Sequence, residues 1–433
     1  MPDLSNNPRQ FAQATAVLSN MCDTPEHLAH PRCLGGRLRN HGSTMTMICL
    51  LIGLTPATAV CQFRSRCEDD TLSYGRACEV GVDDVKLRAA AQSIADAVQQ
   101  DQLHGAVVLV ARNRKIVLHQ AYGWRDQQKT QPMQPDTLFR MASNSKALTA
   151  AGLLLLVDRG EVQLDDRIGT YFPTFAGPRS SRITVRHLLT HTSGWRIPTL
   201  FLKPLLKRSR EHPQAPDLLL EVARFGHVEP EQQPGTTWHY NNAGYNTIAG
   251  LIQLKTGSYQ THLQRHLYDP LGMRDSSNHE SDADHSRMSA IFRKKPDGGW
   301  GVGWQPGDAP DYPFARGSGG MISTALDYAI FCQMLLNNGT YGKRRILSSH
   351  LVQESTRSQA AHIPAAREYG LGWAVAPASD IFSHSGSDGT WAWIDRSQQL
   401  IGLVFTQTQR VSDHRERFRA LVNQACSSPN PER

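Results

Sequence analysis

The sequence predicts an α/β protein of the α+β type with two lobes, an antiparallel sheet flanked by helices and a mainly helical lobe. Three observations predict this fold. Residues 105–122 show an apolar hairpin pattern, residues 161–341 show helical patterns separated by many loops, and residues 369–408 return to strand patterns. Because the late strands can rejoin the early hairpin, we expect the mixed lobe to be discontinuous in sequence.

The composition is typical of a globular enzyme. The chain has 433 residues, 39% of them hydrophobic, which suffices for sizeable cores in two lobes. Its net charge of +7 is modest for this length, and the basic cluster around Lys207, Arg208 and Arg210 has no interleaved aromatic residues or glycine-rich loops. We therefore expect no nucleic-acid partner. The sequence also shows no spanning membrane helix.

The first residues differ in character from the rest of the chain. Arg37 and Arg39 precede the apolar run 47–54, and residues 57–59 then supply an A-x-A cleavage pattern. We interpret residues 1–59 as an export signal with an over-long start. Residues 60–84 are then a Cys-containing linker. Such a signal predicts an exported protein, either periplasmic or secreted.

The rest of the chain is predicted to form one domain, residues 85–424, followed by a tail, residues 425–433. Its mixed lobe covers about 85–160 and 342–424, and its helical lobe covers about 161–341. We expect a helix over residues 85–100 and a hairpin with strands at 105–111 and 116–122. Ser143 then falls at the boundary between the lobes, where pockets tend to form.

Ser143 and Lys146 are candidate catalytic residues. They lie three positions apart, directly before the apolar run 147–157, which predicts a buried helix. Residues at i and i+3 share a helix face, so the lysine amine can reach the serine hydroxyl. Burial and the helix N-terminus both lower the pKa of such a lysine, which makes it a base. The structural alternative is a helix cap beside a solvated lysine.

Tyr240 and Asn242 form a second pattern, Y-x-N, in a loop before a helix expected over residues 243–254. A tyrosine can relay a proton to or from a serine. The amide of Asn242 can donate to a bound carbonyl and accept from an amine. The alternative is that Asn241 or Asn242 caps the helix while Tyr240 only packs.

His384 and Gly386 form a third pattern, H-x-G, on an expected edge strand. We expect His384 to bind the far end of the substrate. Its charge would depend on pH, because an unperturbed imidazole has a pKa of about 6.5. Gly386 would let the substrate backbone approach closely. The alternative is an ordinary hairpin turn.

These three patterns, in this order and in these contexts, resemble the serine penicillin-recognising enzymes. The nearest branch contains class C β-lactamases, D-alanyl-D-alanine carboxypeptidases, family VIII esterases and D-aminopeptidases. Further stretches similar to this family are 136–140, 183–194, 270–273 and 319–324.

The resemblance implies a β-lactamase/transpeptidase-like fold and a serine hydrolase that forms an acyl-enzyme. It implies no cofactor, no metal, and a small-molecule or peptidoglycan-derived substrate. The implied oxyanion hole consists of the backbone N–H groups of Ser143 and Ser387. A carboxypeptidase, a β-lactamase, a carboxylesterase and a D-aminopeptidase all stay open. From another class, a catalytically silent penicillin-binding-like protein also stays open, and the oligomeric state is not predicted.

Two other patterns are interpreted as structural. Residues 255–257 read Lys-Thr-Gly, which matches the family's usual third motif, but they end the helix that follows Asn242. We expect Gly257 to be its C-cap. His187 and His191 have the spacing of a zinc helix, but Leu188 stands where a metalloprotease needs glutamate.

Overall fold

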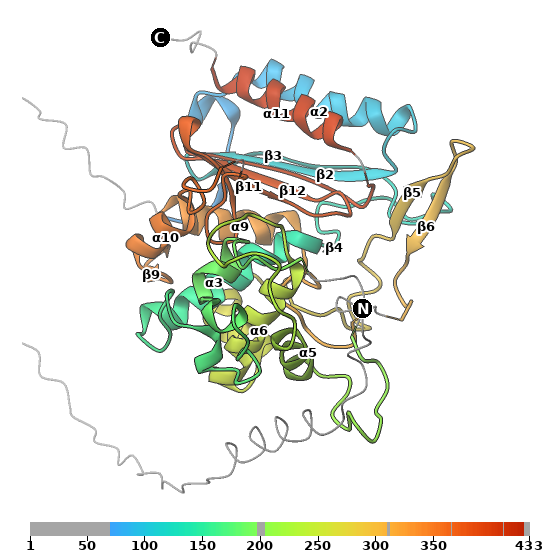
Figure 1. The fold of residues 1–433 in the computed structure, drawn as a ribbon. Coiled ribbons are helices and arrows are strands. Elements are labelled where there is room, and N and C mark those ends of the chain that lie inside the picture. The colour runs from blue at the N-terminus through green and yellow to red at the C-terminus, as the bar shows by residue number, and fades with distance from the viewer. Residues whose placement is uncertain (1–69, 197–203, 310–311, 365, 410, 428–433) are drawn as a thin grey trace, which may run out of the picture. The chain divides into compact units, whose positions relative to one another are not determined.

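The computed structural model describes residues 70–196, 204–309, 312–364, 366–409 and 411–427 (Figure 1). They belong to one compact unit that extends from Asp69 to Arg433. The predicted export signal, residues 1–59, lies outside the described residues. In the described ranges, no helix has both the length and the apolar character needed to cross a lipid bilayer.

A mainly antiparallel sheet of seven strands forms the centre of the described unit (Figure 1). Its strand order is β1-β3-β2-β13-β12-β11-β10, and β1 pairs with β3 in parallel. The late strand β13 pairs with the early strand β2, from Leu400 opposite Arg112 to Thr406 opposite Ala106. The predicted sheet, closed by strands from both ends of the domain, is confirmed. Its strands are β1 (Ser73–Tyr74), β2 (Gly105–Arg112), β3 (Lys115–Gly123), β10 (Ala374–Ala376), β11 (Ile381–Ser385), β12 (Trp391–Asp395) and β13 (Leu400–Thr406).

The turn between β2 and β3 follows from its two residues. Asn113 and Arg114 have φ angles of 46° and 66°, in the left-handed region. Two successive left-handed residues form a type I′ turn, whose twist matches that of the flanking strands. The hairpin that the sequence predicts at this point is confirmed.

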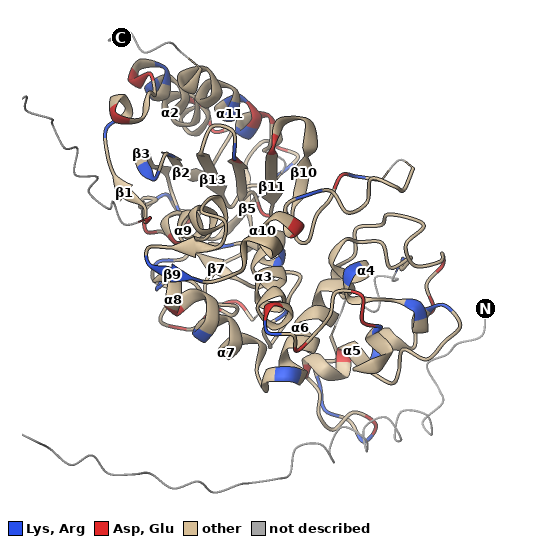
Figure 2. Cartoon of the chain, turned by 90° about the vertical axis from the view of Figure 1, so that its left-hand side faces the viewer, with Lys and Arg blue, Asp and Glu red and all other residues tan. Residues whose placement is uncertain are grey.

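Helices cover both faces of the sheet (Figure 1). On one face, α2 (Asp84–Gln99) and α11 (Ser412–Cys426) share a core with the side chains of Val108 and Trp393. On the other face, α3 (Ser145–Asp158) and α9 (Ala325–Leu336) share a core with Leu109 and Phe405. The central strands are therefore apolar on both sides, and Figure 2 shows them almost free of charged residues.

The remaining helices lie mostly between α3 and α9 in sequence. They are α4 (Val185–Leu189), α5 (Leu218–Gly226), α6 (Asn242–Thr256), α7 (Tyr259–Leu263), α8 (Asp269–Leu271) and α10 (Ser349–Ser355). Three short strand pairs accompany them: β4 (Phe139–Arg140) with β7 (Ile322–Ser323), β5 (Ile291–Lys294) with β6 (Trp300–Trp304), and β8 (Thr340–Tyr341) with β9 (Arg344–Arg345). The β5–β6 hairpin lies at one side of the sheet (Figure 1).

The regular structure begins earlier than the sequence suggests. Residues 73–80, which the sequence assigns to a linker, contain β1 and the short helix η1 (Ala77–Val80). Ala77 and Val82 are buried in the same core as α2 and α11. Asp83 then caps α2, because its side chain accepts hydrogen bonds from the N–H groups of Val85 and Lys86 at 3.0 and 3.1 Å.

Candidate active site

Ser143 lies in a tight turn, the short helix η2 (Ala142–Asn144), directly before α3. Ala142 has a φ of 45°, a left-handed conformation that costs a non-glycine residue about 1–3 kcal/mol. Buried hydrogen bonds stabilise this turn. The Ser145 hydroxyl donates to the carbonyl of Ala142 at 2.6 Å, and the Asn144 amide donates to Thr390 Oγ1 at 2.9 Å. The backbone before the candidate nucleophile is therefore fixed from two sides.

Lys146 and Ser143 meet as the sequence predicts. Lys146 Nζ lies 2.9 Å from Ser143 Oγ, and the lysine is fully buried on α3. The amine also donates to the backbone carbonyl of Ser318 at 2.8 Å, and Asn246 on α6 anchors that residue by accepting from its N–H at 3.0 Å. The Ser318 carbonyl thus orients the amine towards the serine.

The environment of Lys146 favours a neutral amine. Burial lowers its pKa well below the usual value, and the charge of Arg316 lowers it further. No carboxylate contributes an opposing effect among the causes of this shift. A neutral amine has a lone pair, and the hydroxyl of Ser143 can donate its proton to it. This arrangement is that of a base beside a nucleophile.

Tyr240 completes the polar group around Ser143. Ser143 acts on the pKa of the Tyr240 hydroxyl, and the ring centroid of Tyr240 lies 4.8 Å from Lys146 Nζ. Burial of the hydroxyl raises the pKa of Tyr240 to about 12, although Ser143 and the charge of Arg367 both act to lower it. Tyr240 is therefore a neutral phenol near pH 7, which can donate a proton.

His191 packs behind Tyr240. The two ring centroids lie 4.4 Å apart, and the rings of Tyr369 and Tyr245 lie 4.8 and 5.2 Å from the same imidazole. His191 Nδ1 accepts from the N–H of Asn241 at 3.1 Å, and burial lowers the pKa of the imidazole, which keeps it neutral. We call His191, Tyr240, Tyr245, Tyr369 and His384 the aromatic side of the site.

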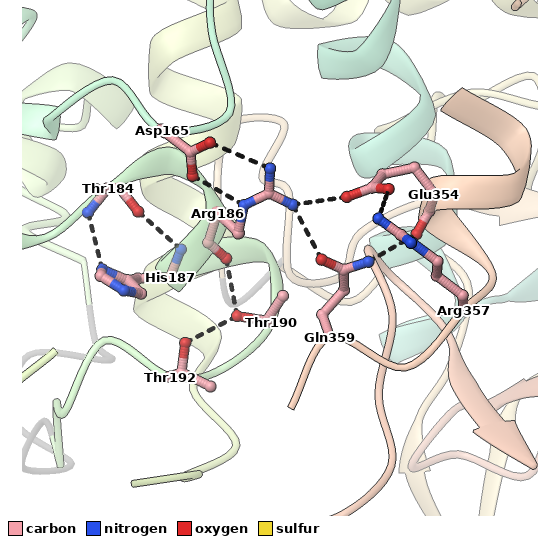
Figure 3. A network of polar contacts seen from close by, with 9 residues as sticks. All are labelled: Asp165, Thr184, Arg186, His187, Thr190, Thr192, Glu354, Arg357 and Gln359. Atoms are coloured by element: carbon pink, nitrogen blue, oxygen red, sulfur yellow. Dashed lines mark hydrogen bonds and ion pairs between the residues drawn. The ribbon is translucent and has the colours of Figure 1, made fainter. Parts of the chain in front are cut away.

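Arg186 on α4 ties the segment before His191 to distant parts of the fold (Figure 3). Its guanidinium donates to both carboxylate oxygens of Asp165 at 2.8 and 3.2 Å. It also donates to Glu354 on α10 at 2.8 Å and to Gln359 at 2.9 Å. Because Glu354 is buried, this pairing is shielded from solvent. The network fixes the helix from which the chain continues to His191.

Asn242 and Ser387 lie in the same pocket as Ser143, a cavity of about 370 Å³. Asn241 caps α6 by accepting from the N–H of Gly244 at 3.1 Å, so the neighbouring Asn242 is not needed as the cap. Asn242 Oδ1 is buried and has no hydrogen-bond partner among the described residues. That acceptor is thus available to a bound molecule.

Gly386 serves the protein's own packing. A Cβ at this position would lie 2.6 Å from the carbonyl oxygen of Met141 and 3.2 Å from Cβ of Ala142. Only glycine therefore lets the end of β11 approach the turn that precedes Ser143. The substrate approach that the sequence suggests for Gly386 is not what requires a glycine here.

His384 differs from expectation in its charge. It is buried on β11, its Nδ1 lies 3.1 Å from the carbonyl of Ser385, and its Nε2 lies 3.0 Å from the hydroxyl of Tyr369. The first contact requires Nδ1–H as donor, so Nε2 accepts from the tyrosine. Burial, followed by the charge of Lys146, lowers the pKa of His384 to about 3. The expected titration near pH 6.5 is therefore replaced by a ring that is neutral at physiological pH.

A comparison with protein families identifies the family of this chain. A model of the β-lactamase family matches residues 90–425, which is most of the chain. The chain belongs to the β-lactamase family. The resemblance seen in the three sequence motifs is thereby confirmed, and the β-lactamase-family serine-hydrolase fold follows from it.

Individual relatives of this β-lactamase-family chain are distant. Protein Rv1367c of Mycobacterium tuberculosis is 29% identical over 358 residues, which span 73% of this chain and 88% of the relative. Esterase EstB of Burkholderia gladioli is 31% identical over 206 residues, 45% of this chain and 52% of the esterase. Among solved structures, the hydrolase EstCE1 superposes with a TM-score of 0.65 at 21% identity, covering 78% of this chain and 99% of its own.

The family's K-T-G pattern at residues 255–257 lies away from the site in this β-lactamase-family chain. Gly257 is the left-handed C-cap of α6, with a φ of 83°, as predicted. Lys255 Nζ instead lies 5.8 Å from the ring centroid of Tyr171. His187 also has a structural contact, because its Nδ1 accepts from the N–H of Thr184 in the capping box of α4.

Sequence reasoning missed four residues around the pocket. The carbonyl of Ser318 holds the lysine, and the side chains of Arg140, Arg293 and Arg316 line the cavity. We call these three arginines the arginine side of the site. The only sequence signal near Ser318 is that the adjoining residues 319–324 are similar to the family. Arg293 has no motif around it.

Proposed function

We propose that the chain is a serine hydrolase that forms an acyl-enzyme on Ser143 with ester or amide substrates. One observation supports this most strongly. The fully buried amine of Lys146 lies 2.9 Å from the hydroxyl of Ser143, and Ser143 lines a pocket. No carboxylate is among the causes of the pKa shift of Lys146. Burying an amine in this way costs stability, and its placement beside a serine is explained by catalysis.

In the first step, Ser143 Oγ attacks the substrate carbonyl carbon while its proton moves to Lys146 Nζ. The carbonyl oxygen becomes an oxyanion, which the N–H groups of Ser143 and Ser387 stabilise. Collapse of the tetrahedral intermediate breaks the bond to the leaving group. The leaving alcohol or amine takes a proton from Tyr240, which is resupplied from Lys146. Water then attacks the ester in the same way and regenerates the serine.

The pKa values assign the base and the acid. Tyr240, with a pKa of about 12, is protonated near neutral pH and is suited to donate. Lys146, whose pKa is lowered by burial and by Arg316, is suited to accept. Asn242 contributes a buried acceptor that can bind an N–H of the substrate or the protonated amine of Lys146. His384, being neutral, supports β11 through Tyr369 and supplies no charge to the substrate.

The first test is covalent labelling. We expect a fluorophosphonate or a fluorescent penicillin to label the parent protein on Ser143, and Ser143→Ala to lose both labelling and turnover. Ser387→Ala is the matched control, because only its backbone N–H has a role. Peptide mapping by mass spectrometry identifies the labelled residue. An adduct on another serine contradicts the assignment, and a folded parent without any adduct or turnover supports the silent binding protein.

The second test resolves the substrate class. Short-chain nitrophenyl esters, D-alanyl-D-alanine peptides, D-amino-acid amides and nitrocefin separate the esterase, carboxypeptidase, D-aminopeptidase and β-lactamase activities. The neutral His384 provides no permanent positive charge on β11 for a peptide carboxylate, so these four activities stay open until the substrates are compared.

We also propose that the protein is exported. The support is the sequence pattern of residues 37–59, in which basic residues precede an apolar run and an A-x-A site. N-terminal sequencing of the protein from culture medium and periplasm checks this. We expect a start near residue 60 and recovery outside the cytoplasm.

A further inference from the structure

The pocket beside Ser143 is lined by three arginines from separate parts of the chain. Arg140 lies on β4, Arg293 on β5 and Arg316 in the loop before β7. With a volume of about 370 Å³, the cavity is large enough for a small organic substrate. Three guanidinium groups around one nucleophile are unexpected for a site that binds only neutral esters.

Two of these arginines are positioned by the β5–β6 hairpin. The guanidinium carbon of Arg140 lies 4.4 Å from the ring centroid of Trp304. Arg293 lies against Gly303, where an added Cβ would come within 2.7 Å of Arg293 Nε. Stacking and close packing fix a guanidinium without occupying its N–H edges. Neither arginine forms an ion pair with any residue that the structure describes.

The third arginine, Arg316, acts on the candidate base through its charge. Its guanidinium carbon lies 3.7 Å from the ring centroid of Tyr312, and its charge is felt by Lys146. This places positive potential next to Ser143 itself. The arginine side therefore extends from the nucleophile to the β5–β6 hairpin.

The acidic residues of the pocket form no ion pair with Arg140 or Arg293 in the part of the chain that the structure describes. Asp308 accepts from the N–H of Gln305 at 3.0 Å, and Asp388 accepts from the amide of Gln409 at 3.4 Å. Within the described ranges, no ion pair joins either aspartate to an arginine. The guanidinium groups of Arg140 and Arg293 are therefore available to an anionic ligand in the pocket.

We propose that this pocket selects substrates with a carboxylate, which Arg140 and Arg293 bind while Arg316 adds favourable potential. Guanidinium groups match the geometry of a carboxylate and stay charged at every physiological pH. This inference rests on the proposed acyl-enzyme function and names its substrate class. It assigns anion recognition to the arginine side and not to His384, where the sequence suggests it.

The test compares anionic esters with neutral esters of the same size. The first pair is the 4-nitrophenyl monoester of glutaric acid and 4-nitrophenyl pentanoate, which differ by a carboxylate on the acyl part. The second pair is 4-carboxyphenyl pentanoate and the same ester with its carboxyl group methylated, which differ by a carboxylate on the leaving group. We expect the parent to prefer one of the two anionic esters by about tenfold or more in kcat/KM. The preferred pair shows on which side of the scissile bond the carboxylate binds.

Arg293→Met then tests the origin of the preference. We expect the kcat/KM of the anionic ester to fall by about ten- to hundredfold, mainly through KM, and that of the neutral ester to stay within about threefold. Lys295→Met is the matched control, because it removes the same charge from an exposed position of the hairpin outside the pocket lining. Turnover of the neutral ester shows that each variant is folded.

The outcomes separate the two proposals. If the parent hydrolyses the neutral esters at least as well as the anionic ones, or if Lys295→Met acts like Arg293→Met, the anion site is refuted and the hydrolase stands. If no ester is hydrolysed and Ser143 is not labelled, both proposals fail. A preference that stays flat from pH 6 to pH 8 supports the arginines. A preference that declines over this range assigns the carboxylate to a histidine and refutes the inference.

Discussion

The aromatic side and the arginine side of the site differ in charge although both adjoin Ser143. On the aromatic side, burial keeps His191 and His384 neutral and Tyr240 protonated. On the arginine side, the pocket is lined by permanent cations. Uncharged rings beside the nucleophile suit proton transfer, whereas a lining of fixed cations suits the recognition of an anion. We infer that chemistry and selectivity are divided between the two sides.

Lys146 lies between the two sides, so its removal should have the largest effect. Lys146→Met keeps the apolar stem and removes the base. We expect kcat to fall by about a hundred- to ten-thousandfold for anionic and neutral esters alike. Steady-state kinetics on both ester types measures this. A loss confined to one ester type would show that the lysine binds substrate and does not act as a base.

His191→Phe breaks the aromatic side and comes next in size. The substitution removes the acceptor for the N–H of Asn241, and the left-handed backbone of His191, with a φ of 63°, disfavours phenylalanine. We expect stability to fall by about 1–3 kcal/mol in urea unfolding. We expect kcat to fall by about tenfold for every substrate, because the segment that carries Tyr240 loses the hydrogen bond between Asn241 and His191.

His187→Asn is the control for this prediction. It removes a ring from the same segment, but His187 contacts Thr184 and not Tyr240. If His187→Asn lowers kcat as much as His191→Phe, the effect comes from the segment and not from the hydrogen bond that His191 accepts from Asn241. If instead His191→Phe changes only the anionic ester, the division between the two sides is wrong.

Arg316→Met sharpens the comparison through pH. A nearby cation destabilises protonated lysine, so Arg316 lowers the pKa of Lys146 and its removal should raise that pKa. Because the neutral amine is the active form, the acid limb of kcat/KM for a neutral ester should move to higher pH. The plateau at high pH should remain. Arg293→Met, whose charge is not among the causes of the lysine shift, should leave this limb in place.

The sequence predicts the residues of the three motifs far better than the arginine side. Ser143 and Lys146 are three residues apart on one helix, so local geometry suffices to join them. Tyr240 and His384 follow from motifs whose contexts, a loop before a helix and a strand, are themselves predictable. The sequence could not show that His384 is neutral, because its burial depends on packing against Tyr369.

The arginine side needs the complete fold. Arg140, Arg293 and Arg316 come from three separate segments, and the β5–β6 hairpin lies in a region where the sequence indicates helices and loops. No periodicity relates these positions. Their meeting follows from long-range contacts, such as the N–H of Phe292 donating to the carbonyl of Gln407 at 2.7 Å, which attaches β5 next to β13.

Lys255→Ala should have the smallest effect and tests which motif completes the site. Lys255 and Asn242 lie at opposite ends of α6, about 20 Å apart by the rise of an α-helix. The lysine amine lies near the ring of Tyr171 and can reach neither the aromatic nor the arginine side. We expect kcat/KM to stay within about threefold of the parent for both ester types, with a stability loss of about 0.3–1 kcal/mol from the helix dipole. A hundredfold loss in a folded variant would mean that K-T-G, and not H-x-G, is the third motif, and that a lysine rather than the neutral His384 completes the site.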